Sequence, residues 1–213
     1  MMRERTHEVA KALLDIQAVS LKPADPFVWT SGLKSPIYCD NRLIMSFPEV
    51  RSFIEEELVA LIKTQYPEVD LIAGTATAGI PHAAIVADRM NLPMIYVRSS
   101  SKGHGKKNAI EGQVSPGQKV VMVEDLISTG KSVIEAANKV EEAGGDVIGA
   151  VAIFSYELQE GHEAFEKQAY SLNTLTSYPE LIEFAVQSEE LLPYKETLND
   201  WYKDPVKWSE QAK

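Results

Sequence analysis

The stretch that decides the fold is "VVMVEDLISTGKS", residues 120–132, in which an apolar run meets two acids and then small and hydroxyl residues. Such an unbroken apolar run is typical of a strand that is buried on both faces of a parallel sheet. The next residues predict a helix over 131–143, because apolar side chains recur at helical spacing, at Val133, Ile134, Ala137 and Val140. The polar residues therefore stand at the carboxyl end of a strand, where open α/β sheets bind ligands.

The same alternation continues along the chain on both sides of this stretch. Apolar runs predict more strands at 69–74, 93–98, 146–154 and 168–175. Apolar periodicity predicts helices over 5–19, 47–66, 80–91 and 179–202. Strands that alternate with helices build a parallel sheet with right-handed crossovers. We therefore expect an α/β fold with an open, mainly parallel, Rossmann-like sheet flanked by helices.

Composition limits the class of protein. With 213 residues, 45% of them apolar and 24% charged, the chain has the size and composition of one globular domain. The net charge of −10 and the pI near 4.9 argue against sequence-independent binding of nucleic acid, which requires a basic surface. Residues 1–21 do not read as a signal peptide, and no window approaches the ~20 apolar residues of a membrane span. Cys39 is the single cysteine, which excludes an intrachain disulfide, and we expect a cytoplasmic protein with neither nucleic acid nor membrane as a partner.

The two acids and the loop after them suit a phosphorylated sugar. A helix N-terminus offers free N–H groups and the positive end of a dipole, and both favour a phosphate. Glu124 and Asp125 can accept hydrogen bonds from sugar hydroxyls, so the acids and the loop address different parts of one ligand. Helix capping is the alternative role of the acids. The stretch is not a Walker P-loop, because Asp125 replaces the glycine required five residues before Gly130, and no G-x-G-x-x-G is present.

These residues resemble the 5-phosphoribosyl 1-diphosphate signature of type I phosphoribosyltransferases. Over most of the chain the resemblance narrows to the orotate phosphoribosyltransferases, because three further segments follow in that family's order: "TSGLKSPIYCDNR" (30–42), "GTATAGIP" (74–81) and "KGHGKKNAIEGQV" (102–114). It implies a single phosphoribosyltransferase domain over 1–213. Its parts are a small N-terminal hood (1–47), an α/β core (48–178) and a C-terminal helical tail (179–213).

The resemblance also implies a reaction. The ribosyl 5-phosphate of 5-phosphoribosyl 1-diphosphate passes to orotate and gives orotidine 5′-phosphate and diphosphate, in de novo pyrimidine (UMP) synthesis. Mg²⁺ accompanies the substrate and is held mainly through it, with no direct ligand from the chain. The implied catalytic residues are Lys102, Glu124 and Asp125. The residues implied to bind 5-phosphoribosyl 1-diphosphate are Arg98, Lys102, His104, Glu124, Asp125, Leu126, Ile127, Ser128, Thr129, Gly130, Lys131 and Ser132.

The segment 98–112, "RSSSKGHGKKNAIEG", is cationic in an acidic chain, and its serines and glycines argue against a regular element. A solvated surface loop is one interpretation. Its position after a strand also suits a lid that closes on a diphosphate and excludes water. The resemblance implies that this lid reaches the active site of a neighbouring subunit, and hence a homodimer with shared sites. Lys106 and Lys107 have weaker claims and are equally well explained as solvated charge.

Recognition of the base is where the chain departs most from its relatives. The resemblance implies orotate contacts from Ser128 and Tyr38, whereas Cys39 is better explained as a buried thiol. Some relatives carry basic ligand-binding residues where Thr30 and Glu157 stand in this chain. Those contacts are therefore absent, and the sequence names no replacement.

The loop "AGTATAGIPHA" (73–83) also leaves a strand and enters a helix. The resemblance assigns it to the diphosphate, although tight packing of strand on helix explains its small residues equally well. Many relatives carry an aromatic residue and a lysine where this chain has Thr77 and Ala78. Backbone N–H groups must then make the diphosphate contacts.

Two other functions stay open. Another type I phosphoribosyltransferase, acting on a purine or on uracil, would share residues 124–132 but need not share the hood. A non-catalytic, ligand-sensing regulator of the same fold would usually bring a DNA-binding region and a basic surface. The sequence displays neither feature, so transfer to orotate is the reading we prefer.

Overall fold

The computed structural model describes residues 2–29, 31–99 and 109–212. Contacts divide the chain into two compact units: Pro48–Leu175, and a second unit in which Met1–Phe47 joins Thr176–Lys213. Each unit has buried apolar residues of its own. The predicted boundaries of hood, core and tail stay a prediction.

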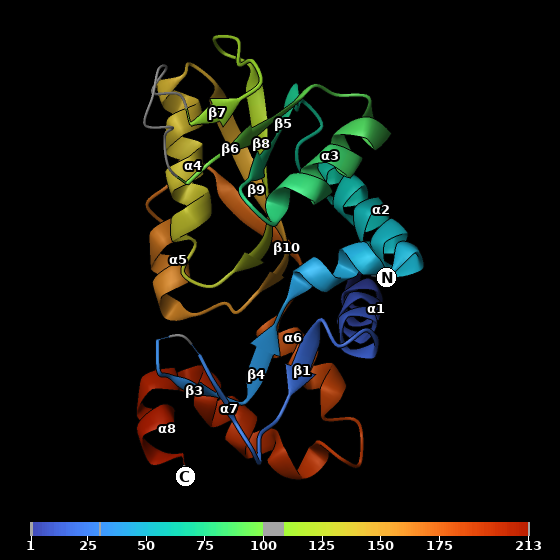
Figure 1. Cartoon of the computed structure of the whole chain (residues 1–213), viewed down its shortest axis with the longest axis vertical. Helices are drawn as coiled ribbons and strands as arrows, with labels where there is room; N and C mark the ends of the chain where they lie inside the picture. The colour runs from blue at the N-terminus through green and yellow to red at the C-terminus, as the bar shows by residue number, and fades with distance from the viewer. Residues whose placement is uncertain (1, 30, 100–108, 213) are drawn as a thin grey trace. The chain divides into compact units, whose positions relative to one another are not determined.

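The unit Pro48–Leu175 is organised around a six-stranded sheet (Figure 1). Its strands lie in the order β10-β9-β8-β5-β6-β7. The four central strands β6, β5, β8 and β9 are parallel, and β7 is antiparallel to β6. The strand bounds are β5 Leu71–Thr75, β6 Met94–Val97, β7 Ile110–Glu111, β8 Lys119–Ile127, β9 Asp146–Ser155 and β10 Ser171–Ser177. The prediction of an open, mainly parallel sheet is confirmed.

Helices cover both faces of this sheet. Figure 1 shows α4 and α5 on one side and α2 and α3 on the other. The bounds are α2 Pro48–Gln65, α3 Gly79–Met90, α4 Lys131–Glu142 and α5 Gln159–Phe165. Because both faces are covered, the central strands are buried on both sides, and every residue of β5 is buried. This explains why their sequences are unbroken apolar runs.

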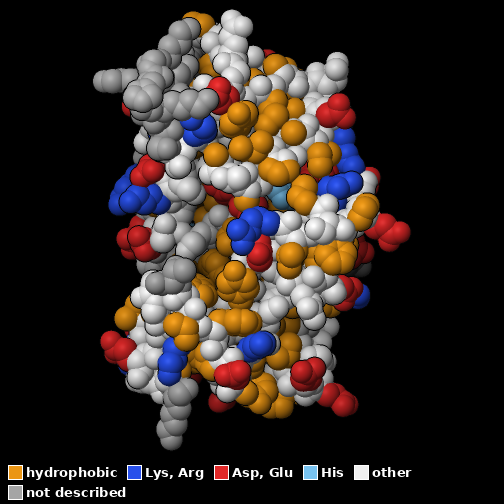
Figure 2. Space-filling model, in the orientation of Figure 1, with side chains coloured by type: hydrophobic (Ala, Val, Ile, Leu, Met, Phe, Trp, Pro, Cys, Tyr) orange, Lys and Arg blue, Asp and Glu red, His pale blue; other side chains and the backbone are white. Residues whose placement is uncertain are grey.

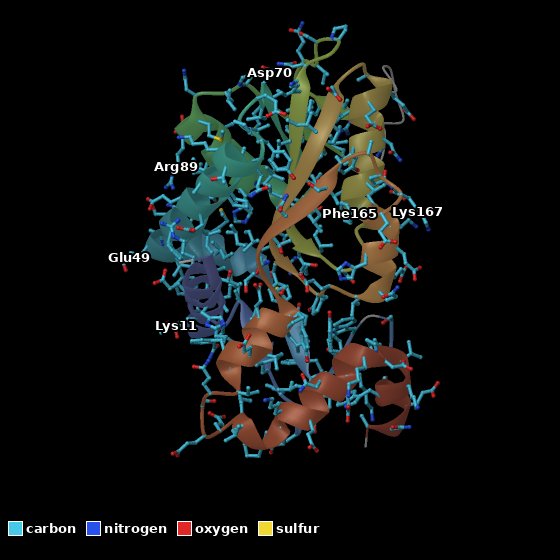
Figure 3. The ribbon with its side chains drawn as sticks, turned by 180° about the vertical axis from the view of Figure 1, so that it is seen from behind. Lys11, Glu49, Asp70, Arg89, Phe165 and Lys167 are labelled. Carbon is cyan, nitrogen blue, oxygen red and sulfur yellow. The ribbon has the colours of Figure 1, made fainter. Side chains whose placement is uncertain are left out.

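Polar contacts fasten α2 to α3. His82 Nδ1 and Glu55 Oε1 lie 2.6 Å apart, and both side chains are buried. At the other end of α3, Arg89 donates to the backbone oxygen of Ser52 at 2.9 Å and to its hydroxyl at 2.8 Å (Figure 3 labels Arg89). The helix that leaves β5 is therefore held at two points along its length.

The second unit combines the two ends of the chain. Its strands are β1 Val19–Leu21, β2 Phe27–Val28, β3 Lys34–Ser35 and β4 Ile37–Cys39. Its helices are α1 Met2–Asp15, η1 Asn41–Ser46, α6 Tyr178–Ala185, η2 Leu192–Tyr194, α7 Lys195–Lys203 and α8 Pro205–Gln211. Trp201 is fully buried among aromatic rings, with Trp29 at 5.9 Å and Tyr178 at 5.0 Å between ring centroids.

Several element predictions were wrong in detail. The segment 179–202 is not one helix, because α6 ends at Ala185 and Pro193, which lacks an N–H group, stands in the short helix η2. The first helix ends at Asp15 instead of reaching 19, since Gln17 adopts a positive φ of 58°. The segment 98–112, expected to be irregular, contains the strand β7, which pairs with β6. The helix α5, at Gln159–Phe165, was not predicted.

Charge is mixed on the face shown in Figure 2, where Lys and Arg side chains alternate with Asp and Glu. No helix among residues 2–29, 31–99 and 109–212 is long and apolar enough to cross a membrane.

Candidate active site

The carboxyl ends of four parallel strands meet at one edge of the sheet. They are Thr75 of β5, Val97 of β6, Ile127 of β8 and Ser155 of β9. The backbone registers pair Val97 with Thr75 and Ile127 with Ser155, so β5 and β6 stop together, as do β8 and β9. The loops that carry most predicted ligand-binding residues therefore leave the sheet side by side. Asp70, labelled in Figure 3, marks the opposite edge, where β5 begins.

Strand β8 extends further than predicted. It runs to Ile127, two residues beyond the expected end at Asp125, so Leu126 and Ile127 continue the strand past the two acids. Strand β5 ends beside Glu124, because Gly74 pairs with Val123. Ile127 packs in the core at 2% exposure. A ligand contact from Ile127 would therefore have to come mainly from its backbone, whereas the contact from Leu126, which is half-buried, stays a prediction.

The loop after β8 consists of Ser128 and Thr129, with Gly130 directly before α4. Gly130 has a φ of 75°, a region that disfavours other residues, and a Cβ there would lie 2.6 Å from the Phe165 ring (labelled in Figure 3). Gly161 of α5 also approaches this loop, since a Cβ there would lie 3.0 Å from the Ser128 carbonyl oxygen. The chain therefore enters α4 through a tightly packed turn that leaves the first helical N–H groups for a ligand.

Glu124 is the more buried of the two acids, with 5% exposure. Its Oε2 accepts a hydrogen bond from the Ser132 hydroxyl at 3.2 Å, and its Oε1 accepts one from the Asp125 N–H at 3.2 Å. Burial, together with the charge of Asp125, raises the pKa of the Glu124 carboxyl to about 9. With this raised pKa, Glu124 is neutral near pH 7 in the ligand-free protein. Asp125 is less buried than Glu124, because its side chain is only half-buried.

The loop 76–78 joins β5 to α3 right beside Glu124. A Cβ at Gly79 would lie 2.4 Å from the carbonyl oxygen of Val123 and 3.3 Å from the Cα of Glu124, so only glycine fits. The Ala76–Thr77 peptide bond is cis. The Thr75 hydroxyl is buried and has no hydrogen-bond partner among the described residues. Close packing explains part of the small-residue pattern, and it also brings the loop against the acids.

The basic segment is only partly described. Arg98 follows β6, and its Nε lies 3.2 Å from Glu111 Oε1. Its backbone N–H donates to the carbonyl of Ala109 at 2.8 Å, and this bond joins two residues near the ends of the segment. Of the other predicted contacts, Lys102 and His104 lie outside the described residues, as do Lys106 and Lys107.

Residues at the ends of β8 and β9, from α5 and from the start of β10 line a cavity of about 500 Å³. It brings together Ser128, the predicted base contact, and Glu157, where some relatives carry arginine. Among the described residues that line it are Glu157, His162 and Glu166, but no lysine or arginine. A lysine or arginine for an anionic base would therefore have to come from outside these lining residues.

Tyr38 belongs to the other unit. It is 45% exposed, and its ring centroid lies 5.6 Å from that of Phe27, over which the Lys22 ammonium stands at 5.2 Å. Cys39 is half-buried instead of buried as expected, and its thiol donates to Asn41 Oδ1 at 3.3 Å. Thr30 lies outside the described residues. The base contact from Tyr38 stays a prediction.

Two contacts of the helix α4 were missed. Lys131, predicted to bind phosphate, is 80% exposed and lies 3.9 Å from Glu135. Ser132 turns its hydroxyl to Glu124, and Lys139 donates to backbone carbonyls at the end of β6. The spacing of Ser132 and Lys139, two helical turns apart on one face, is the only sequence signal that could have suggested this.

Metal binding by side chains alone is not favoured in the part of the chain that the structure describes, which contains no group of three or more His, Cys, Asp or Glu placed to hold an ion. Mg²⁺, however, commonly keeps several waters and binds through one or two carboxylates and the phosphates of a substrate. Asp125 and Glu124 offer carboxylates of this kind at the sheet edge, so the residues present fit an ion that arrives with its substrate.

Comparison with known proteins agrees with this geometry. The phosphoribosyl transferase domain matches residues 54–191. The orotate phosphoribosyltransferase of Listeria monocytogenes is 55% identical over 202 residues, which cover 94% of this chain and 97% of the relative. That of Enterococcus faecalis is 54% identical over 97% and 99% of the two chains. The crystal structure of orotate phosphoribosyltransferase from Aeropyrum pernix, 27% identical, superposes with a TM-score of 0.75 over 84% of this chain and 99% of that one. The chain therefore belongs to the phosphoribosyltransferase family and, within it, to the orotate phosphoribosyltransferases.

Proposed function

We propose that the protein transfers the ribosyl 5-phosphate of 5-phosphoribosyl 1-diphosphate to orotate. The bond between ribose C1 and the diphosphate oxygen breaks, C1 bonds to a ring nitrogen of orotate, and that nitrogen loses its proton. The products are orotidine 5′-phosphate and diphosphate. The names of relatives more than half identical over nearly the whole chain support this choice of base.

The observation that carries the proposal is the joining of two acids to a helix N-terminus by one short turn. Glu124 and Asp125 lie near the carboxyl end of β8, and Ser128 to Gly130 lead from that strand directly into α4. A ribose 5-phosphate separates its 5-phosphate from its 2- and 3-hydroxyls by a few bonds. The helix N-terminus suits the phosphate, and the carboxylates suit the hydroxyls.

The same acids can assist the chemistry. Positive charge develops on the ribose ring as diphosphate leaves, and a fixed carboxylate nearby stabilises that charge. The raised pKa of Glu124 means that it can enter the reaction cycle neutral and donate a hydrogen bond, while Asp125 supplies the negative charge. The two acids then differ in role because they differ in burial.

Three further features belong to the proposal. Mg²⁺, bound mainly to the diphosphate, would offset the charge of the leaving group, and Asp125 and Glu124 are the side chains best placed beside it. The protein would work as a homodimer in which segment 98–112, including Lys102 and His104, completes the neighbour's site. The absence of disulfide potential, with Cys39 as the one cysteine, supports a cytoplasmic location.

The test is a spectrophotometric assay in which orotate absorbance falls on addition of 5-phosphoribosyl 1-diphosphate and Mg²⁺. We expect turnover with orotate, none with adenine or uracil, and loss of activity on chelation of Mg²⁺. Turnover with a purine base alone would overturn the choice of base. Binding of 5-phosphoribosyl 1-diphosphate without turnover of any base would favour a ligand-sensing regulator.

A further inference from the structure

We propose that Lys139 is a positioning residue for the diphosphate end of the site, which it serves by fixing the backbone at Arg98 and Ser99. Lys139 lies in the last turn of α4, far along the helix from the phosphate loop. The inference rests on the proposed function, because Arg98 is one of the residues proposed to contact the diphosphate.

The contact itself is a clamp on two carbonyl groups. Lys139 Nζ donates to the backbone oxygen of Arg98 at 2.9 Å and to that of Ser99 at 3.1 Å. Both residues lie just beyond β6, which ends at Val97. An ammonium makes charge-assisted hydrogen bonds to such carbonyls, and these are stronger than neutral ones. Lys139 thus fixes a backbone turn that the sheet itself no longer orders.

The opposite side of the same turn is held by a different element. The Arg98 N–H donates to Ala109, and β7 follows at once, with Glu111 3.2 Å from the Arg98 guanidinium. Arg98 is therefore gripped at its N–H, at its carbonyl and at its side chain. Removing Lys139 would free the carbonyl side, so the direction of the Arg98 side chain would be less defined.

Helix geometry connects this clamp to the phosphate loop. Ser132, Ala136 and Lys139 lie on one face of α4, because they are separated by four and three residues. That face lines a small cavity together with Thr75 and Ala76, at the start of the loop 76–78. One rigid helix thus reaches Glu124 at its first turn, through Ser132, and the exit of β6 at its last turn.

Charge distinguishes this role from simple stabilisation. A lysine in the last turn of a helix is favourable for the helix dipole, and such an effect changes only stability. Here the half-buried ammonium and Arg98, which is paired with Glu111, line one small cavity, so an anion that enters it would meet two cations. A diphosphate beside Thr75 and Ala76 would be such an anion.

The experiment compares Lys139→Met, which keeps the length of the side chain and removes its donors, with Lys139→Arg, which keeps charge and donors. For Lys139→Met we expect the KM for 5-phosphoribosyl 1-diphosphate, and the KM for diphosphate in the reverse reaction, to rise about tenfold, the loss of one charge-assisted hydrogen bond. The KM for orotate should stay within about twofold, and Lys139→Arg should restore most of the loss. Lys63→Met, on the exposed side of α2, is the matched control and should change none of these constants.

A second comparison separates a positioning role from a structural one. If Lys139 acts through Arg98, Arg98→Ala and Lys139→Met should not add, and the double variant should be no worse than Arg98→Ala alone. The inference would be overturned if the KM for 5-phosphoribosyl 1-diphosphate and the KM for orotate rose equally while the melting temperature fell. An unchanged KM for 5-phosphoribosyl 1-diphosphate would overturn it too. If Lys139→Met does not fold, Lys139→Gln carries the same test.

Failure of the proposed function has a different signature. Calorimetric binding of 5-phosphoribosyl 1-diphosphate without orotate measures the role of Lys139 independently of the base. An unmodified protein that binds this substrate but does not consume orotate would refute the proposed function. In that case a weaker affinity of Lys139→Met for the same substrate would still support the inference.

Discussion

The two ends of the proposed substrate are served by regions of very different construction. The ribose-phosphate end is one continuous piece of chain, in which β8, a three-residue loop and the first turn of α4 follow without interruption. The diphosphate end is assembled from the loop after β5, the end of β6 and the far end of α4. The first region can be read from a short motif, whereas the second exists only after folding. If the proposed function holds, a contiguous motif serves the sugar phosphate, whereas the contacts to the leaving group depend on tertiary structure.

The largest effect is expected from a change at Asp125, the more exposed of the two acids. In Asp125→Asn we expect turnover to fall by about 100- to 1000-fold, the range for removal of one electrostatic contact to a transition state. At pH 5, close to the ordinary pKa of Glu124, the melting temperature should hardly change, because the Asp125 side chain is only half-buried. Steady-state kinetics measures the effect. Asp146→Asn, at the opposite edge of the sheet, is the control, and an equal loss there would refute a local role.

Glu124 differs from Asp125 in that it should affect stability as well as activity. Its pKa is raised to about 9, so the folded protein holds a proton that the unfolded chain releases above its ordinary value of 4.5, and stability falls as pH rises between these values. Glu124→Gln removes that dependence. Between pH 5 and pH 8 we expect the variant to gain up to about 4 kcal/mol relative to the unmodified protein, measured by denaturant unfolding.

The companion variant Asp125→Asn provides the check on this explanation. It removes the neighbouring charge that contributes to the raised pKa of Glu124, so the slope of stability against pH should become shallower. If both variants leave the slope unchanged, Glu124 is not the titrating group.

Glycine at position 79 tests the junction of the two regions. Its missing Cβ lets α3 approach Val123 and Glu124, and an added methyl group would lie 2.4 Å from a backbone oxygen. Gly79→Ala should therefore cost about 1–3 kcal/mol of stability through overpacking, and should weaken binding of 5-phosphoribosyl 1-diphosphate. Thermal unfolding and calorimetry measure the two effects. Ala84→Ser, exposed on the same helix, should change neither.

The smallest effect is expected from Ser132, whose hydroxyl holds Glu124 at 3.2 Å. Ser132→Ala should raise the KM for 5-phosphoribosyl 1-diphosphate by about three- to tenfold, in proportion to one lost hydrogen bond. Ser132→Thr, which keeps the hydroxyl, should recover it. Additive effects of Ser132→Ala and Glu124→Gln would show that the hydroxyl serves the phosphate directly.

The regions also differ in how well the sequence predicted them. The apolar runs at β5, β6, β8 and β9 identified the sheet, because strands buried on both faces leave an unmistakable pattern. The end of β8 was predicted two residues too early, because pairing with β9, and not local composition, carries the strand past the two acids to Ile127.

Other features had no local signal at all. The bond from Ser132 to Glu124 depends on the turn at Gly130, and the clamp by Lys139 joins residues forty positions apart. The burial that separates Glu124 from Asp125 depends on the close approach of α3 at Gly79. Such contacts arise only from tertiary packing, so a motif could name the acids but not distinguish them.

The proposed function assigns the acids to the ribose and the loop to the phosphate, and the binding of two small ligands tests this division. Calorimetry would compare ribose 5-phosphate with inorganic phosphate, on the unmodified protein and on Asp125→Asn. We expect the variant to bind ribose 5-phosphate about tenfold more weakly and inorganic phosphate no more weakly than before. An equal loss of affinity for both ligands would contradict the division of roles between the acids and the loop.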